Sequence, residues 1–176
     1  LVNVEDGFHF WSEKYDRNMD DIFAIQDEIA LAITEHLKIT LLENDLEKIT
    51  KTFTQNTEAY ECYLKGRFHL NRRGSSILTG LHYFKRAIEI DPDYALAYSG
   101  YADANMIAAG YNLFSGKAIL KETEKALEIA MGLDDSVSEI YCSLGLYCLL
   151  ERNWTEAKKN FIRAIELKPG YAQPYS

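Results

Sequence analysis

The sequence predicts an all-α chain built from repeated helix pairs, with a short β-hairpin at its start. The stretch "FKRAIEIDPDYALAYS" (84–99) returns 77 residues later as "FIRAIELKPGYAQPYS" (161–176), with ten of the sixteen letters identical. Each copy has apolar residues at helical spacing, then a proline, then a tyrosine-rich segment. Proline lacks the N–H that continues a helix and disfavours helical geometry in the residue before it. Each copy therefore predicts a helix, a turn and a new helix.

The first 56 residues do not follow this repeat. The residue pattern of 1–17 alternates on both sides of "EDG", which indicates two short strands joined by a turn. An isolated hairpin is marginal in water. We therefore assign residues 1–19 to a β-hairpin that is left from a truncated α/β domain. Residues 20–56 are expected to form leader helices and a linker. The main leader helix is predicted from about 20 to 42, where apolar side chains recur every three or four residues at Ile22, Ile25, Ile29, Ile33 and Leu37.

The most regular unit runs from Ser138 to Tyr171 and is 34 residues long. Ser136, with Glu139 three residues later, predicts the cap of its first helix, and Asn153, with Glu156, predicts the cap of its second. Small residues stand where two helices would cross closely, and bulky ones stand between them.

This unit resembles a tetratricopeptide repeat (TPR), whose pattern is an aromatic, a Leu-Gly pair, and then Ala, an aromatic, Ala and Pro. Cys148 departs from the pattern, since an aromatic is usual there. The resemblance implies a solenoid of helix pairs. The matching residues are Tyr141, Leu144, Gly145, Ala157, Phe161, Ala164 and Pro169.

Two less regular units come before it. We assign residues 57–94 to the first repeat, with two extra residues near "NRRGSS", and 95–137 to the second, with nine extra residues around "AAGYNLFSGKA". Residues 138–171 form the third repeat and 172–176 begin a fourth. Because a solenoid repeat cannot bury both faces alone, the helix over 154–167 should expose apolar surface.

The segment "FWSEKYDRNMDDIFAIQDEIA" (10–30) resembles the junction that ends a TolB-like domain and precedes TPRs in bacterial signalling proteins. Such regions follow adenylate cyclase, protein kinase or winged-helix domains. The resemblance implies that the chain is a regulatory piece of a larger signalling protein.

Charge and composition argue against several partners. The net charge is −8, and residues 1–56 hold 12 acids against 5 bases, so no basic footprint for nucleic acid is present. No apolar run approaches the roughly 20 residues that cross a bilayer. Three cysteines, at 62, 142 and 148, fit a reducing compartment, so a cytoplasmic location is expected.

Nothing in the sequence predicts catalysis, a metal or a cofactor. "GYNLFSGKA" (110–118) has five residues between its glycines where a P-loop has four, and Ala118 replaces the hydroxyl residue, so we expect a flexible insertion loop. The four histidines, at 9, 36, 69 and 82, do not cluster with acids or cysteines at ligand spacings.

In TPR arrays the first helices line a concave groove, and we call the corresponding candidate surface the first-helix face. It is mixed apolar and aromatic with few charges, which suits a peptide or helix of a partner protein and not an acidic tail. The alternative is that these residues pack against the chain's own helices. The main candidates are Tyr60, Tyr63, Arg67, Asn71, Ser99, Asp103, Met106, Cys142, Leu146 and Leu149, with Leu70, Leu96, Ile107, Glu139 and Leu150 at further inward positions.

The expected function is therefore a non-catalytic protein-interaction scaffold. Two alternatives remain open from the sequence. The chain could be a self-association module, in which the leader helix or the end of the solenoid pairs two copies. It could also be the regulatory fragment of an adenylate cyclase- or kinase-type enzyme.

Overall fold

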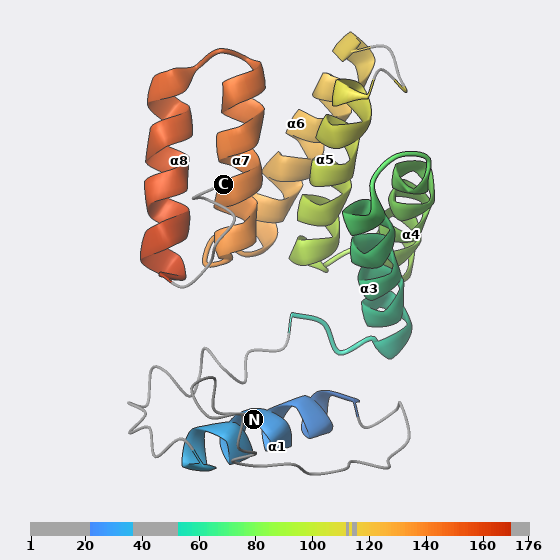
Figure 1. Ribbon diagram of the computed structural model, residues 1–176, viewed down its shortest axis with the longest axis vertical. Helices are drawn as coiled ribbons and strands as arrows, with labels where there is room; N and C mark the ends of the chain where they lie inside the picture. The colour runs from blue at the N-terminus through green and yellow to red at the C-terminus, as the bar shows by residue number, and fades with distance from the viewer. Residues whose placement is uncertain (1–21, 37–52, 112, 114–115, 170–176) are drawn as a thin grey trace, which may run out of the picture. The chain divides into compact units, whose positions relative to one another are not determined.

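The computed structural model describes residues 22–36, 53–111, 113 and 116–169. The chain divides into two compact units, residues 1–57 and 58–176. Every regular element in the described ranges is an α-helix (Figure 1), so the all-α prediction is confirmed there. The predicted β-hairpin over 1–19 and the start of a fourth repeat at 172–176 lie outside the described residues.

The first unit contains α1 (Ile22–His36). Ile22, Ile25, Ile29 and Ile33 are all half-buried, whereas Gln26 and Glu28 are exposed. The helical spacing of the isoleucines thus matches the helix, and its predicted continuation to residue 42 lies outside the described residues.

The second unit contains three helix pairs joined by tight turns. The central helix α5 packs against α4, α6 and α7, and twelve of its sixteen residues are buried (Figure 1). Its neighbours therefore cover it on several sides, which explains its small and apolar composition. The pairs are α3 (Thr57–Arg72) with α4 (Ser76–Ile90), α5 (Ala95–Gly110) with α6 (Gly116–Leu133), and α7 (Ser138–Leu150) with α8 (Trp154–Leu167).

Glycines let the helices approach closely around a phenylalanine. The ring of Phe84, which is fully buried, lies against both Gly66 of α3 and Gly100 of α5, so a methyl group at Gly66 would come within 2.7 Å of it. A methyl group at Gly145 would come within 2.5 Å of Phe161 in the same way. The crossing points expected from small residues are thus close contacts between helices.

The turns between successive repeats are closed by aspartate. The Asp91 carboxylate accepts a hydrogen bond from the Asp93 N–H at 3.1 Å, and the Asp134 carboxylate accepts one from the Ser136 N–H at 3.0 Å. The second of these turns lacks proline, but its aspartate makes the same contact as Asp91 does in the first. The Ser136 hydroxyl also bonds Asp134, at 2.7 Å, and does not cap α7, so that prediction is wrong.

The cap predicted for α8 is confirmed, because the Asn153 side chain accepts a hydrogen bond from the Glu156 N–H at 3.3 Å.

The insertion in the second repeat differs from the expected loop. α5 has 16 residues against 13 in α7, and α6 has 18 against 14 in α8, so helix extension accounts for seven of the nine extra residues. Gly110 is the last residue of α5 and Gly116 is the first residue of α6.

The helix α8 exposes apolar surface, as predicted for residues 154–167. Trp154 is 66% exposed and Ile162 is 46% exposed. None of the described helices is both long and apolar enough to cross a membrane.

Candidate functional site

The first-helix face is carried by α3, α5 and α7, the first helix of each pair. Its residues fall into two groups by burial. The buried group comprises Leu70, Leu96, Ser99, Asp103, Met106 and Cys142. The half-buried or exposed group comprises Tyr60, Tyr63, Arg67, Asn71, Ile107, Glu139, Leu146, Leu149 and Leu150.

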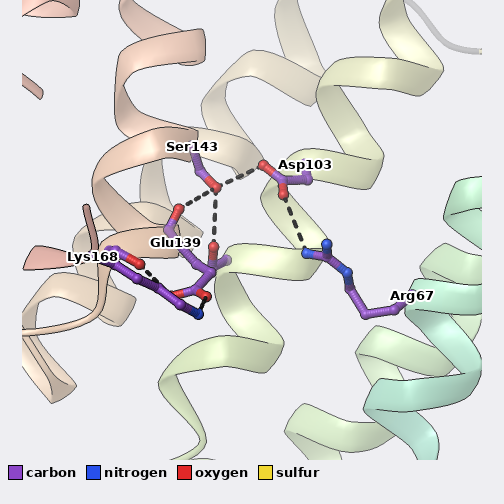
Figure 2. Close-up of polar contacts among 7 residues, drawn as sticks. Arg67, Asp103, Glu139, Ser143 and Lys168 are labelled. Atoms are coloured by element: carbon purple, nitrogen blue, oxygen red, sulfur yellow. Dashed lines mark hydrogen bonds and ion pairs between the residues drawn. The ribbon is translucent and has the colours of Figure 1, made fainter. Parts of the chain in front are cut away.

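A chain of polar contacts crosses the centre of this face and joins the first helices of all three repeats (Figure 2). The Ser143 hydroxyl of α7 donates to Asp103 Oδ1 of α5 at 2.6 Å. Its oxygen lies 3.0 Å from the Ser99 hydroxyl, which can donate to it in turn. Arg67 of α3 approaches the other oxygen of Asp103 at 3.9 Å. These polar side chains thus link α3 to α5 and α5 to α7.

Burial dominates the chemistry of Asp103. Desolvation raises the pKa of this carboxyl to about 6, although the hydrogen bond from Ser143 and the positive charges of Arg67 and Arg73 lower it. The Arg67 contact is too long for a hydrogen bond, and its side chain is 30% exposed, so it offsets only part of the desolvation. A fraction of the Asp103 carboxyl groups is therefore protonated near the lower end of the physiological pH range.

Tyr63 belongs to the core as much as to the face. Its ring lies 5.9 Å from the Phe84 ring and 5.4 Å from the Tyr94 ring, and burial raises its pKa to about 12. At the opposite edge, Glu139 pairs with Lys168 at 3.2 Å (Figure 2). The tyrosine thus anchors α3 to its neighbours, and the ion pair joins α7 to the residue after α8.

Three half-buried or exposed leucines of the face lie together on α7. Leu146, Leu149 and Leu150, which we call the α7 leucine patch, are spaced three and four residues apart and so share one side of the helix. Leu150 is 51% exposed. This patch can bury apolar surface of a partner.

The described residues hold no arrangement suited to nucleophilic or metal chemistry. The Ser143 hydroxyl is fully buried, and burial raises the pKa of the Cys142 thiol to about 12. No group of three or more histidine, cysteine or acidic side chains in the described part of the chain could hold a metal ion.

Ser143 was missed by the sequence reasoning, although it is the centre of the polar chain. A signal was present. It is a hydroxyl residue in the middle of the otherwise apolar helix "SEIYCSLGLYCLL", where a buried polar group requires a partner.

Solved structures share this arrangement of helices. The first TPR domain of Spaghetti (RPAP3), described as bound to the HSP90 peptide SRMEEVD, matches with a TM-score of 0.53 and 18% identity over 71% of this chain and 90% of its own. The chain has the tetratricopeptide-repeat fold. The second TPR domain of the same protein, with the same peptide, matches with a TM-score of 0.50 and 21% identity over 63% of this chain and 93% of its own.

No family model matches the sequence. Among curated proteins, a Rhizobium meliloti (strain 1021) protein named "Putative adenylate cyclase 3" is 31% identical over 100 residues, which are 56% of this chain. The matched region spans only 17% of that protein.

Proposed function

We propose that this TPR array is a non-catalytic protein-interaction scaffold that binds a peptide or helix of a partner along its first-helix face. The observation that carries the proposal is the likeness in fold to two TPR domains described as bound to a peptide. The α7 leucine patch supports it, because exposed leucines on one helix side are suited to an apolar ligand.

The charge of the face indicates a ligand different from the peptide of those two domains. SRMEEVD has three acidic residues and one basic residue. The first-helix face has one base, Arg67, which lies beside Asp103, and its acid Glu139 pairs with Lys168. The face has no cluster of bases to pair with three carboxylates, so we propose an apolar or weakly basic helical segment as the ligand.

The proposal is tested by selecting peptides from a random displayed library on the 176-residue chain and measuring their affinity for variants. Leu146→Glu combined with Leu149→Glu should weaken binding at least tenfold, since two charges would be placed in the apolar contact. Trp154→Glu combined with Ile162→Glu on α8 is the matched control and should leave affinity within twofold. Asp103 and Met106 are unsuitable for this test because both are buried.

If the α8 variant loses binding and the α7 variant retains it, the ligand binds elsewhere and the proposed face is wrong. A library that yields no binding peptide at all would also count against a peptide-binding function.

Self-association is a second candidate, and the exposed Trp154 and Ile162 on α8 favour it. Two copies could bury these side chains against each other. Sedimentation of the chain at increasing concentration should then show a rising mass, and the same α8 double variant should abolish the rise. A constant monomeric mass would exclude this candidate.

The wider setting is also a proposal. The 100-residue match to the protein named as an adenylate cyclase supports a regulatory role within a larger cytoplasmic signalling protein. In that role the chain positions partners, and any cyclase or kinase chemistry belongs to another domain. We expect neither nucleic acid nor a membrane as its partner, since the repeats are nearly neutral overall.

A further inference from the structure

A pocket of about 350 Å³ lies between α4, α5 and α6, away from the first helices α3 and α7. It is lined by side chains of α5 and of α4 and α6, the second helices of repeats one and two. Pockets that bind small molecules begin at about 300 Å³ and are mostly apolar, with a few polar groups. This pocket is therefore large enough for a ligand of one or two rings.

The lining is divided by burial into a floor and a rim. The floor is apolar and aromatic, with Tyr101 and Ala126 buried and Ile88, Tyr98 and Ile129 half-buried. The rim consists of exposed charged side chains from α4 and α6, namely Lys85, Glu89, Glu122 and Lys125.

Two contacts hold the rim against the floor. The Tyr101 hydroxyl donates a hydrogen bond to Glu122 at 2.8 Å. The Lys85 ammonium lies 5.5 Å from the centre of the same ring, within the range of a cation–π contact. An aromatic ring entering the pocket would meet the rings of Tyr98 and Tyr101, with the charges of Lys85 and Glu122 beside Tyr101.

The balance of charge selects the ligand. Two ammonium and two carboxylate groups surround the opening. A ligand with a single charge is therefore attracted by the two groups of opposite charge and repelled by the two of like charge. A ligand that has both charges can pair with both. We propose that the α4–α6 pocket binds a zwitterionic aromatic small molecule of the size of an aromatic amino acid. This site is independent of the first-helix face.

The test uses four probes that share the indole ring and differ in the charged groups of the side chain: L-tryptophan, tryptamine, indole-3-acetate and indole. Each is titrated into the 176-residue chain by calorimetry, with amide chemical shifts recorded in parallel. L-tryptophan should bind most tightly, and each singly charged probe should bind roughly three- to fivefold more weakly, as expected for one exposed ion pair. The shifts should concentrate on Tyr98, Tyr101 and Ala126.

Two variants test the location. Ile88→Trp places a larger side chain from α4 in the pocket and should abolish binding of L-tryptophan. Ile162→Trp, the same change on the exposed side of α8, should not. Lys125→Gln should reduce the affinity for L-tryptophan roughly threefold and should not reduce the affinity for tryptamine, since the charge of Lys125 attracts only the carboxylate of L-tryptophan. Lys121→Gln, also exposed on α6 but outside the pocket, should change neither.

Three results would overturn the proposal. They are equal affinity for indole and L-tryptophan, unchanged binding to a folded Ile88→Trp chain, and no binding of any probe at 10 mM. If circular dichroism shows that Ile88→Trp does not fold, the comparison of Lys125→Gln with Lys121→Gln tests the location of the site by itself. None of these outcomes bears on peptide binding at the α7 leucine patch, so the two proposals can fail separately.

Discussion

Phe84 is a single side chain on which three helices converge. It is fully buried, and its ring contacts Gly66 on one side and Gly100 on the other. Gly100→Ala would place a methyl group against that ring, and a fully buried ring has little room to move. We expect a loss of about 1–3 kcal/mol in the free energy of unfolding, measured by urea denaturation.

Gly132→Ala is the matched control for that substitution. Gly132 lies in α6 with no other atom within 4 Å of the position its Cβ would take. Alanine is favoured over glycine in a helix by about 1 kcal/mol, so this variant should be as stable as the native chain or more stable. A similar loss in both variants would show that the Phe84 contact is not the cause.

Asp103 should make stability depend on pH. Its pKa is raised from 3.8 to about 6, so the folded chain holds a proton that the unfolded chain releases between those values. The resulting stabilisation is complete below pH 3.8 and is lost as the pH rises through about 6. It amounts to at most about 3 kcal/mol, from two units of pKa difference. Burial causes this rise in the pKa and the charge of Glu139 adds to it, whereas the hydrogen bond from Ser143 and the charges of Arg67 and Arg73 oppose it.

The measurement is the urea midpoint of the native chain and of Asp103→Asn at intervals from pH 4 to pH 8. The amide oxygen can still accept the hydrogen bond from Ser143, but it does not titrate. The native chain should therefore lose stability relative to the variant as the pH rises. Parallel curves would mean that Asp103 keeps an ordinary pKa when folded.

At the scale of one helix, the cap of α8 is a measurable contribution. Asn153→Ala removes the hydrogen bond to the Glu156 N–H and should destabilise the chain by about 1 kcal/mol, read from thermal unfolding. Ser75 occupies the same position before α4 but makes no capping hydrogen bond. Ser75→Ala should therefore change stability by only a few tenths of a kcal/mol. Equal effects of the two substitutions would contradict a specific role for the Asn153 side chain.

The helix pairs could be predicted because their signals are local. Helical spacing, Pro92 and Asn153 each act within a few residues, and the structure confirms the helices they predict. The cap at Ser136 was predicted wrongly because Asp134 competes for the same hydroxyl. The insertion near Gly110 was expected as a loop, whereas longer helices α5 and α6 contain most of the extra residues. The length of a repeat does not tell whether extra residues extend a helix or a loop.

The candidate site was less predictable because burial depends on neighbouring helices. Residue types on the first-helix face follow from the repeat, but spacing alone does not tell which side chains the next helix covers. Ser99, Asp103 and Cys142 are buried between α5 and α7, whereas Leu149 on the same face is only half-buried. The α4–α6 pocket also arises from the placement of three helices, so no short motif marks it.

Considered as a whole, the second unit is a row of helix pairs in which neighbouring pairs pack through α4 against α5 and through α5 and α6 against α7. Such arrays unfold as coupled units, and their stability is close to a sum of repeat and interface contributions. Two phenylalanines at matching places in the repeat have different roles here. Phe84 lies between the first and second pairs, whereas Phe161 lies against Gly145 within the third.

We therefore expect Phe84→Ala and Phe161→Ala to loosen different ends of the array. Phe84→Ala should cost about 3–5 kcal/mol, because a fully buried ring is lost, and should speed amide hydrogen exchange first in α3 and α4. Phe161→Ala, at a partly buried ring, should cost less and speed exchange first in α7 and α8. Each variant is the control for the other. If both raise exchange uniformly from α3 to α8, the described repeats unfold as one unit, and the additive picture of this array is wrong.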